Sequence, residues 1–243
     1  MNARPILEIK GLRAFYGAAQ IVFDVDLHLA SGETVALMGR NGAGKSTTMK
    51  AIMGMIERRY EHAVFLGRDI ARLKPYQIAR LGLGFVPEDR RIFTDLTILE
   101  NLEIGRKLAP TGAVADVRPA WTPERLFELF PNLAEARNRS AGRMSGGEQQ
   151  MLTVARTLMG NPLAILLDEP SEGVAPVIIE QMADMILNLK REGVSIILSE
   201  QNLRFAALVA DRAYVLERGE IKFEGAMQAL LRDESARRAY LEL

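Results

Sequence analysis

The chain has 243 residues, of which 48% are hydrophobic and 26% charged, enough to build one globular core. Lysine plus arginine and aspartate plus glutamate both number 31, so the zero net charge gives no electrostatic argument for a nucleic-acid partner. The absence of cysteine excludes disulfides, thiolate chemistry and zinc–thiolate sites. Without a signal-like start or a run of ~20 apolar residues, we expect a soluble chain that reaches a membrane only through a partner.

The first two strand signals lie before residue 30. Residues 6–12 alternate loosely between apolar and polar side chains, and residues 22–29 alternate more regularly. In the second segment we expect Phe23, Val25, Leu27 and Leu29 on one face and Asp24, Asp26 and His28 on the other. Both segments are predicted to be strands.

Three short apolar runs predict strands that are buried on both faces. They cover residues 34–38, 163–167 and 194–198, and each is followed by polar or glycine-rich residues and then by a helical pattern. Buried strands that alternate with helices indicate a largely parallel α/β sheet.

Helix signals replace strand signals over residues 89–160. Capping boxes are indicated by Thr97 with Glu100 and by Ser145 with Glu148, an N-cap with proline by Thr122 and Pro123, and helix ends by Gly160 and Gly193. Because no linker flanks residues 89–160, we interpret them as a helical subdomain within a single domain of residues 1–243.

The strongest chemical signal is the segment ETVALMGRNGAGKSTTMK. It satisfies the pattern G-x-x-x-x-G-K-[ST] directly after a buried strand and at the head of a helix. Backbone N–H groups of such a loop wrap phosphates, and the helix dipole adds positive potential. Lys45 is expected at the β- and γ-phosphates of ATP, and Ser46 at Mg²⁺. The predicted nucleotide-binding residues here are Gly39, Arg40, Asn41, Gly42, Ala43, Gly44, Lys45, Ser46 and Thr47.

Two carboxylates end the apolar run in LAILLDEPSEG. Asp168 is suited to hold Mg²⁺, and Glu169, adjacent but directed elsewhere, is suited to polarise an attacking water as a general base. Two acids at a strand end can be a simple polar cap, but beside a phosphate loop we predict that they are functional.

A second anion-binding helix start is predicted in RMSGGEQQMLTVARTLMG, where Ser145, Gly146 and Gly147 open a capped helix. One nucleotide does not need two such sites in one chain. Placed one helix ahead of ILLDEP, this segment resembles the signature motif of ATP-binding cassette (ABC) proteins, with Met144 where leucine is commoner.

The resemblance covers essentially the whole chain. It implies the P-loop NTPase fold of ABC ATPases, an α/β fold with a mainly parallel sheet core, an N-terminal antiparallel β part and a helical insertion. Family members bury ATP between two subunits arranged head to tail, so that the phosphate loop of one faces the Ser-Gly-Gly helix of the other. The resemblance also implies that Tyr16 stacks on adenine and that Ser145, Gly146 and Gly147 bind nucleotide.

Three positions depart from the commonest family pattern. Glu88 stands where glutamine is usual, Ala175 where aspartate is usual, and Gln201 where most members carry a switch histidine. Together, VPEDRRIF, SEGVAP and LSEQN resemble the ATPase subunits of bacterial branched-chain amino acid importers. We expect Gln201 to act in catalysis by hydrogen bonding. Glu88 is expected to contact Mg²⁺ or its water in the closed site, with an outward-facing loop acid as the alternative.

The resemblance implies an ATPase, with ATP and Mg²⁺ as cofactors, that drives import of branched-chain amino acids. Its expected place is the cytoplasmic face of the inner (plasma) membrane, attached through its helical insertion to permease subunits. A second ATPase, a related paralogue or a copy of itself, completes the dimer, and a solute-binding protein delivers the solute; no nucleic acid is expected.

Three alternatives remain open from the sequence. The residues do not distinguish a branched-chain amino acid importer from an importer of the same build for amides or urea. A soluble, non-transport ABC ATPase of translation or DNA repair usually has two cassettes or a long coiled-coil insertion, and this sequence has neither. A regulatory module without turnover is disfavoured by the intact Lys45, Ser46, Asp168 and Glu169.

Overall fold

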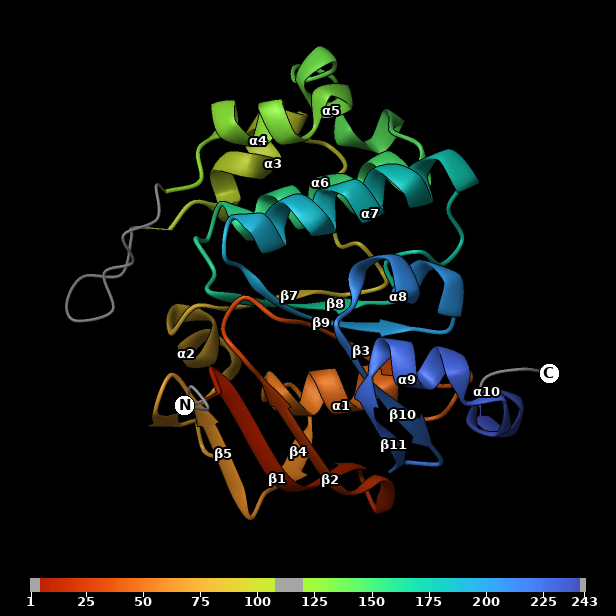
Figure 1. Ribbon diagram of the computed structural model, residues 1–243. Coiled ribbons are helices and arrows are strands. Elements are labelled where there is room, and N and C mark those ends of the chain that lie inside the picture. The colour runs from red at the N-terminus through yellow and green to blue at the C-terminus, as the bar shows by residue number, and fades with distance from the viewer. Residues whose placement is uncertain (1–4, 108–119, 241–243) are drawn as a thin grey trace.

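The computed structural model describes residues 5–107 and 120–240, which form two β-sheets with helices between and above them (Figure 1). The strands are β1 (Leu7–Tyr16), β2 (Ala19–Leu29), β3 (Thr34–Met38), β4 (Glu57–Arg59), β5 (His62–Phe65), β6 (Arg68–Asp69), β7 (Leu83–Val86), β8 (Ala164–Asp168), β9 (Ser195–Glu200), β10 (Arg212–Glu217) and β11 (Glu220–Ala226). The helices are α1 (Lys45–Ile52), α2 (Pro75–Arg80), α3 (Ile98–Gly105), α4 (Pro123–Leu129), α5 (Pro131–Glu135), α6 (Gly146–Leu158), α7 (Pro176–Arg191), α8 (Leu203–Val209), α9 (Met227–Arg232) and α10 (Glu234–Tyr240), with a 3-10 turn at Ala141–Arg143.

The central sheet has the strand order β11–β10–β3–β9–β8–β7. All neighbours run parallel except β11, which pairs antiparallel with β10. The three strands predicted to be buried on both faces are confirmed as β3, β8 and β9, which lie side by side and expose no residue. The predicted α/β class with a mainly parallel sheet is therefore confirmed.

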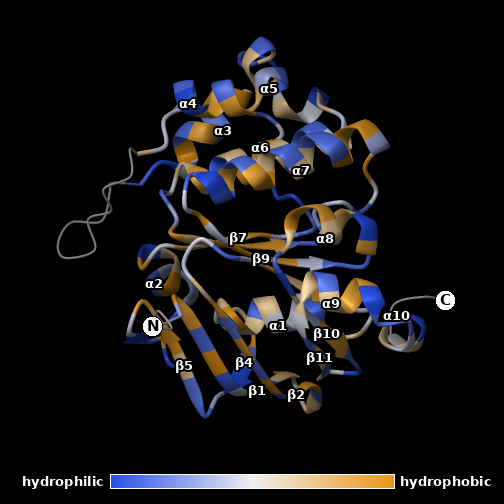
Figure 2. Cartoon of the chain, viewed as in Figure 1, coloured by the Kyte–Doolittle hydropathy of each residue, from blue (hydrophilic) through white to orange (hydrophobic). Residues whose placement is uncertain are grey.

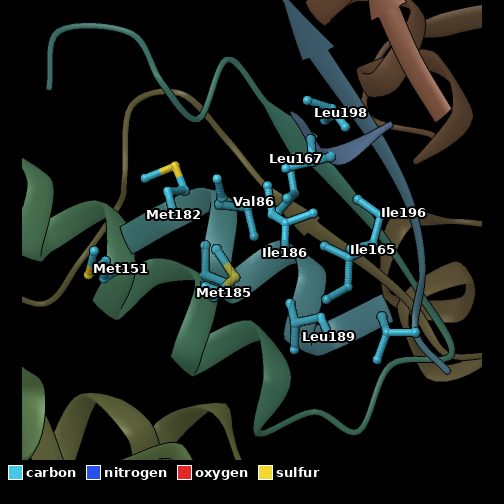
Figure 3. Close-up of a cluster of buried hydrophobic side chains, with 14 of the residues drawn as sticks. Val86, Met151, Ile165, Leu167, Met182, Met185, Ile186, Leu189, Ile196 and Leu198 are labelled. Carbon is cyan, nitrogen blue, oxygen red and sulfur yellow. The ribbon is translucent and has the colours of Figure 1, made fainter. Parts of the chain in front are cut away.

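Alternate residues of each central strand enter two different cores, which explains why these strands have no polar face. Ile165 and Leu167 of β8 pack in the core that contains Met185 of α7 (Figure 3). Ala164 and Leu166 of the same strand pack in the other core, which β1, β2 and α1 complete. Because both faces of the sheet are buried, the side chains on each face lose contact with water. This favours valine, isoleucine and leucine at every position of the strand.

The second sheet is the antiparallel N-terminal part, with the order β2–β1–β5–β6 and with β4 pairing with β1. One prediction here is wrong, because Phe23 is 39% exposed, whereas Val22 and Val25 are fully buried. Asp24 has a φ of +48°, and the pairing of β1 with β2 shifts register around it. A bulge of this kind reverses the face of the next side chain, and strict alternation along the sequence does not reveal it.

Helices α3 to α7 lie on the side of the central sheet that faces away from the antiparallel sheet (Figure 1). The predicted capping boxes at Thr97 and Ser145 are confirmed, and Thr122 caps α4. In α6 and α7 hydrophilic and hydrophobic residues alternate along the helix (Figure 2), as expected for helices with one face on a core. The predicted helical subdomain, residues 89–160, includes residues 108–119, which lie outside the described residues.

Candidate nucleotide site

The candidate site forms where three neighbouring parallel strands end. In the central sheet β9 lies between β3 and β8, so that Met38 pairs with Glu200 and Asp168 pairs with Ser199. The predicted phosphate loop follows β3, Asp168 ends β8 with Glu169 directly after it, and Gln201 follows β9. Because the carboxyl ends of parallel strands share one edge of the sheet, segments far apart in sequence meet there.

The loop between β3 and α1 takes a path that depends on glycine. Gly44 precedes α1 with a φ of +107°, a region that favours glycine, and no side chain caps the helix start. Gly39 has a φ of +155°, and a Cβ added there would lie 2.4 Å from the backbone oxygen of Leu216. Free backbone N–H groups at the head of a helix are the donors that a phosphate requires.

Lys45 is buried and its ammonium group is fully engaged. Its Nζ donates to the backbone oxygens of Gly39 at 2.9 Å and Arg40 at 3.1 Å. The third contact is an ion pair with Oε1 of Glu169, also at 2.9 Å. Three contacts match the three donors of an ammonium group, so the charge is held in place across the loop.

Asp168 has one satisfied and one free carboxylate oxygen. Oδ1 accepts hydrogen bonds from Ser46 Oγ at 2.9 Å and from Ser199 Oγ at 2.7 Å. Oδ2 is buried and has no hydrogen-bond partner among the described residues. Burial raises the pKa of Asp168, and the two serine hydrogen bonds offset part of that rise. A buried carboxylate oxygen without a partner beside a serine hydroxyl fits the needs of a hard divalent cation.

Glu169 is held in a strained and crowded position. Its φ is +46°, which is rare for a residue with a side chain, and its backbone N–H donates to Ser199 Oγ at 2.9 Å. Its carboxylate contacts Lys45 through Oε1 and receives a hydrogen bond from Gln201 Nε2 at Oε2, 3.1 Å away. Burial alone would raise the pKa of Glu169, but hydrogen bonds with Glu172 and Lys45 outweigh it and lower the pKa.

Gln201 connects the phosphate loop to the acid pair. Besides its contact with Glu169, its Nε2 donates to Asn41 Oδ1 at 2.6 Å. A side-chain amide has two N–H donors, and both are used here. The structure thus brings Gln201 next to Glu169, as expected of a residue that acts in the same site.

A pocket of about 560 Å³ lies over the phosphate loop. Its lining includes Tyr16 and Glu88, which sequence reasoning also assigned to the nucleotide site, and Glu172, which it did not. Tyr16 is 48% exposed, an open position that suits stacking of a base on its ring. Hydrogen bonding to Glu169 raises the pKa of Glu172 to about 7.

Ser145, Gly146 and Gly147 do not line this pocket. They begin α6, where Ser145 Oγ accepts from the backbone N–H of Glu148 and the Glu148 carboxylate accepts from the backbone N–H of Ser145. Arg139 pairs with Glu148 at 2.9 Å. The two predicted anion sites are therefore separate surfaces within one chain.

Sequence reasoning missed Ser199 and Glu172. Ser199 pairs with Asp168 near the end of β9 and binds both acids, and the shared edge of parallel strands was a signal that could have located it. No sequence signal distinguishes Glu172 from an ordinary loop acid, because its role depends on the fold of residues 169–172. There the backbone N–H of Glu172 donates to the Glu169 oxygen at 3.2 Å.

Comparison with known proteins places this geometry in a family. Residues 22–172 match the family model described as ABC transporter. The chain is 41% identical over 237 residues to the high-affinity branched-chain amino acid transport ATP-binding protein BraG of Pseudomonas aeruginosa, covering 97% of this chain and 99% of that protein. It is 34% identical over 243 residues to the lipopolysaccharide export system ATP-binding protein LptB of Haemophilus influenzae, covering 97% of both.

A solved structure agrees with these matches. The ADP conformation of MJ1267, an ATP-binding cassette of an ABC transporter, superposes with a TM-score of 0.80 at 26% identity and covers 97% of this chain and 98% of that one.

Proposed function

This chain belongs to the ABC transporter family of ATPases, and we propose that it hydrolyses ATP to energise a membrane importer for branched-chain amino acids. The observation that carries the proposal is the meeting of Lys45, Asp168, Glu169 and Gln201 at one edge of the central sheet beside a phosphate loop. That arrangement supplies a cation for phosphate, a ligand for a metal ion and a proton acceptor at one edge of the sheet.

The residues of the site divide the work of hydrolysis. Lys45 and the N–H groups at the start of α1 bind the phosphates and neutralise charge on them. Glu169 takes the proton of the attacking water, and Gln201 orients that water or the carboxylate by hydrogen bonding. A phosphate that draws Lys45 away removes one of the interactions that lower the pKa of Glu169, so ATP binding itself makes the base stronger.

Mg²⁺ would be held by Asp168 and Ser46, and it would neutralise charge on the β- and γ-phosphates. The free, buried Oδ2 of Asp168 supports this assignment. The described residues hold no group of three or more His, Cys, Asp or Glu side chains that could bind a metal. Mg²⁺ commonly takes only one or two carboxylates and completes its shell with phosphates and water, so this donor set fits. Glu88, which lines the pocket, would join when the site closes.

The second anion site, at the start of α6, would serve a nucleotide bound by a partner subunit. Gly146 and Gly147 at the head of α6 would bind the phosphates of ATP held by the phosphate loop of another ATPase subunit. Two chains placed head to tail would then enclose two nucleotides. The absence of Ser145, Gly146 and Gly147 from the lining of the pocket over Lys45 supports this arrangement.

A groove of about 430 Å³ between α2, α3 and the end of α6 is the proposed contact with the permease. Three large side chains that line it are exposed, namely Tyr76, Phe93 and Ile104. Arg156 also lines the groove, and its Nη1 is buried without a partner within the described part of the chain. No helix within residues 5–107 and 120–240 has the length and apolarity to cross a bilayer. By its resemblance to importer ATPases, we propose that the chain sits at the cytoplasmic face of the membrane, bound to membrane subunits.

The identity of the transported solute is inferred from sequence similarity to other proteins. BraG, named for branched-chain amino acid transport, is 41% identical, and LptB, named for lipopolysaccharide export, is 34% identical. The higher identity supports import of branched-chain amino acids, and the LptB similarity makes lipopolysaccharide export the second candidate. An importer for amides or urea would share the same residues.

Complementation separates the two candidates. The chain would be expressed in a Pseudomonas aeruginosa strain that lacks BraG and, separately, in an Escherichia coli strain depleted of LptB. We expect leucine uptake to recover in the first strain and growth not to recover in the second. The Lys45→Ala variant serves as the matched negative control. Recovery only in the second strain would contradict the importer proposal while leaving the ATPase assignment intact.

A further inference from the structure

Arg90 connects the loop after β7 to the first turn of α6. A Cβ added to Gly146 would lie 2.6 Å from Nη1 of Arg90 and 3.1 Å from its Cζ and Nη2. The guanidinium group of Arg90 therefore lies directly against the first residue of α6. Any side chain at position 146 would displace it.

The backbone fixes Arg90 in this place. Thr153 belongs to α6, and its hydroxyl donates to the backbone oxygen of Arg90 at 2.7 Å. Arg90 and Arg91 both have positive φ values, +61° and +49°, so the loop turns sharply before it reaches α3. This hydrogen bond uses the backbone oxygen, so it does not require the Arg90 side chain.

The charge of Arg90 is not used within the described residues. Its neighbour Asp89 pairs with Arg91 at 2.8 Å, and Glu148 in the first turn of α6 pairs with Arg139. No carboxylate of the described part of the chain forms an ion pair with Arg90. A half-buried cation without a counter-ion beside the free N–H groups of a helix start makes this surface strongly attractive to an anion.

The same loop carries Glu88 on the pocket over Lys45, so its two ends face two different anion sites. We propose that Arg90 is a phosphate-contacting residue that acts on the nucleotide held by a second copy of this chain. The inference rests on the proposed head-to-tail pairing. Arg90 would add a guanidinium to the N–H groups of Gly146 and Gly147, and would report through its loop to the chain's own pocket.

The test compares Arg90→Gln, Arg90→Lys and the matched control Arg91→Gln, all in the full chain carrying Glu169→Gln. Arg91 is the next residue of the same loop and also has a positive φ, so Arg91→Gln controls for loss of one positive charge from this loop. Dimer formation is followed by light scattering during titration with MgATP, and binding of ADP to the monomer by fluorescence. Thermal unfolding of each variant reports on folding.

Loss of a hydrogen bond to a charged phosphate should raise the MgATP concentration for half-maximal dimer formation roughly 10- to 100-fold in Arg90→Gln. For Arg90→Lys, the MgATP concentration for half-maximal dimer formation should lie between those of the parent and Arg90→Gln. For Arg91→Gln it should equal that of the parent, and the ADP affinity should be the same in every variant. Equal dimer formation by Arg90→Gln and Arg91→Gln overturns the role of Arg90, even if Arg90→Gln unfolds earlier. An equal loss of ADP affinity in Arg90→Gln would mean that Arg90 serves its own subunit's nucleotide, which also overturns it. If the Glu169→Gln parent stays monomeric in MgATP, head-to-tail pairing with a second copy of this chain is wrong, and the role of Arg90 proposed on it falls.

Discussion

Lys45 and Glu169 form a buried ion pair, with 2.9 Å between Nζ and Oε1 and with both side chains at most 7% exposed. The cation that is proposed to bind phosphate thus neutralises the base that is proposed to activate water. On the proposed roles, ATP would replace Glu169 at Lys45 and release the base, which would tie activation of the base to the presence of substrate.

Lys45→Ala should abolish most ATP binding and should also destabilise the chain without nucleotide. Removing one partner of a buried pair leaves the other charge uncompensated, at a cost of about 3–5 kcal/mol as an upper range. Adding Glu169→Gln to Lys45→Ala should recover much of that loss, because no buried charge then remains unpaired. Urea unfolding of the two single variants and the double variant measures the coupling. Lys10→Ala, on the exposed side of β1, is the control. Simple additivity would mean that the pair does not act as a unit.

Gln201→Ala should lower turnover roughly tenfold to a hundredfold, since it removes hydrogen bonds to a charged group worth about 1.5–3 kcal/mol. Gln201→His should keep substantial activity and add a pH dependence near neutrality, because a histidine titrates there and an amide does not. Steady-state phosphate release between pH 6 and 8 measures both effects. Full turnover in Gln201→Ala would reduce this residue to a structural link between Asn41 and Glu169.

Glu88→Gln should change the Mg²⁺ dependence of turnover. Glu88 lines the same pocket as Lys45, so its carboxylate can tighten contact with Mg²⁺ or with a water bound to it. The measurement is phosphate release at a fixed ATP concentration over a Mg²⁺ titration. Asp89→Asn, one residue along the loop and paired with Arg91, is the matched control. Identical titrations for parent and Glu88→Gln would favour an outward-facing loop acid.

Glu172→Gln should stabilise the chain at pH 8 but not at pH 4. The hydrogen bond to Glu169 raises the pKa of Glu172 from 4.5 to about 7 in the folded chain. Between these values the folded state holds a proton that the unfolded state releases, so stability falls as pH rises through this window. Glutamine does not titrate and removes that loss. The melting temperatures of the parent and Glu172→Gln, measured in EDTA at pH 4, 6 and 8, test this prediction. Glu180→Gln, at an exposed residue of α7, is the control. An equal shift at all three pH values would show that the two carboxyl groups do not share a proton.

The fold and the centre of the site could be predicted from the sequence for identifiable reasons. Strands β3, β8 and β9 are buried on both faces, so their apolar runs stand out, and the phosphate loop is a local pattern of glycines before Lys45. Asp168 and Glu169 could be predicted because they directly follow the apolar run of β8.

The features that were missed depend on segments that meet only in the folded chain. The exposure of Phe23 depends on the bulge at Asp24, and the role of Ser199 depends on the pairing of β9 with β8. The contact of Arg90 with Gly146 joins residues 56 positions apart, which no local pattern encodes.

We propose that this chain hydrolyses ATP with Glu169 as the general base. The most direct measurement is Mg²⁺-dependent phosphate release by purified parent and Glu169→Gln chains, with bound ATP quantified in the same samples. We predict that Glu169→Gln loses at least about a hundredfold in turnover, within the range that general base catalysis supplies, while it still binds ATP and accumulates as an ATP-bound dimer. Phosphate release by Glu169→Gln at the rate of the parent would rule out Glu169 as the general base.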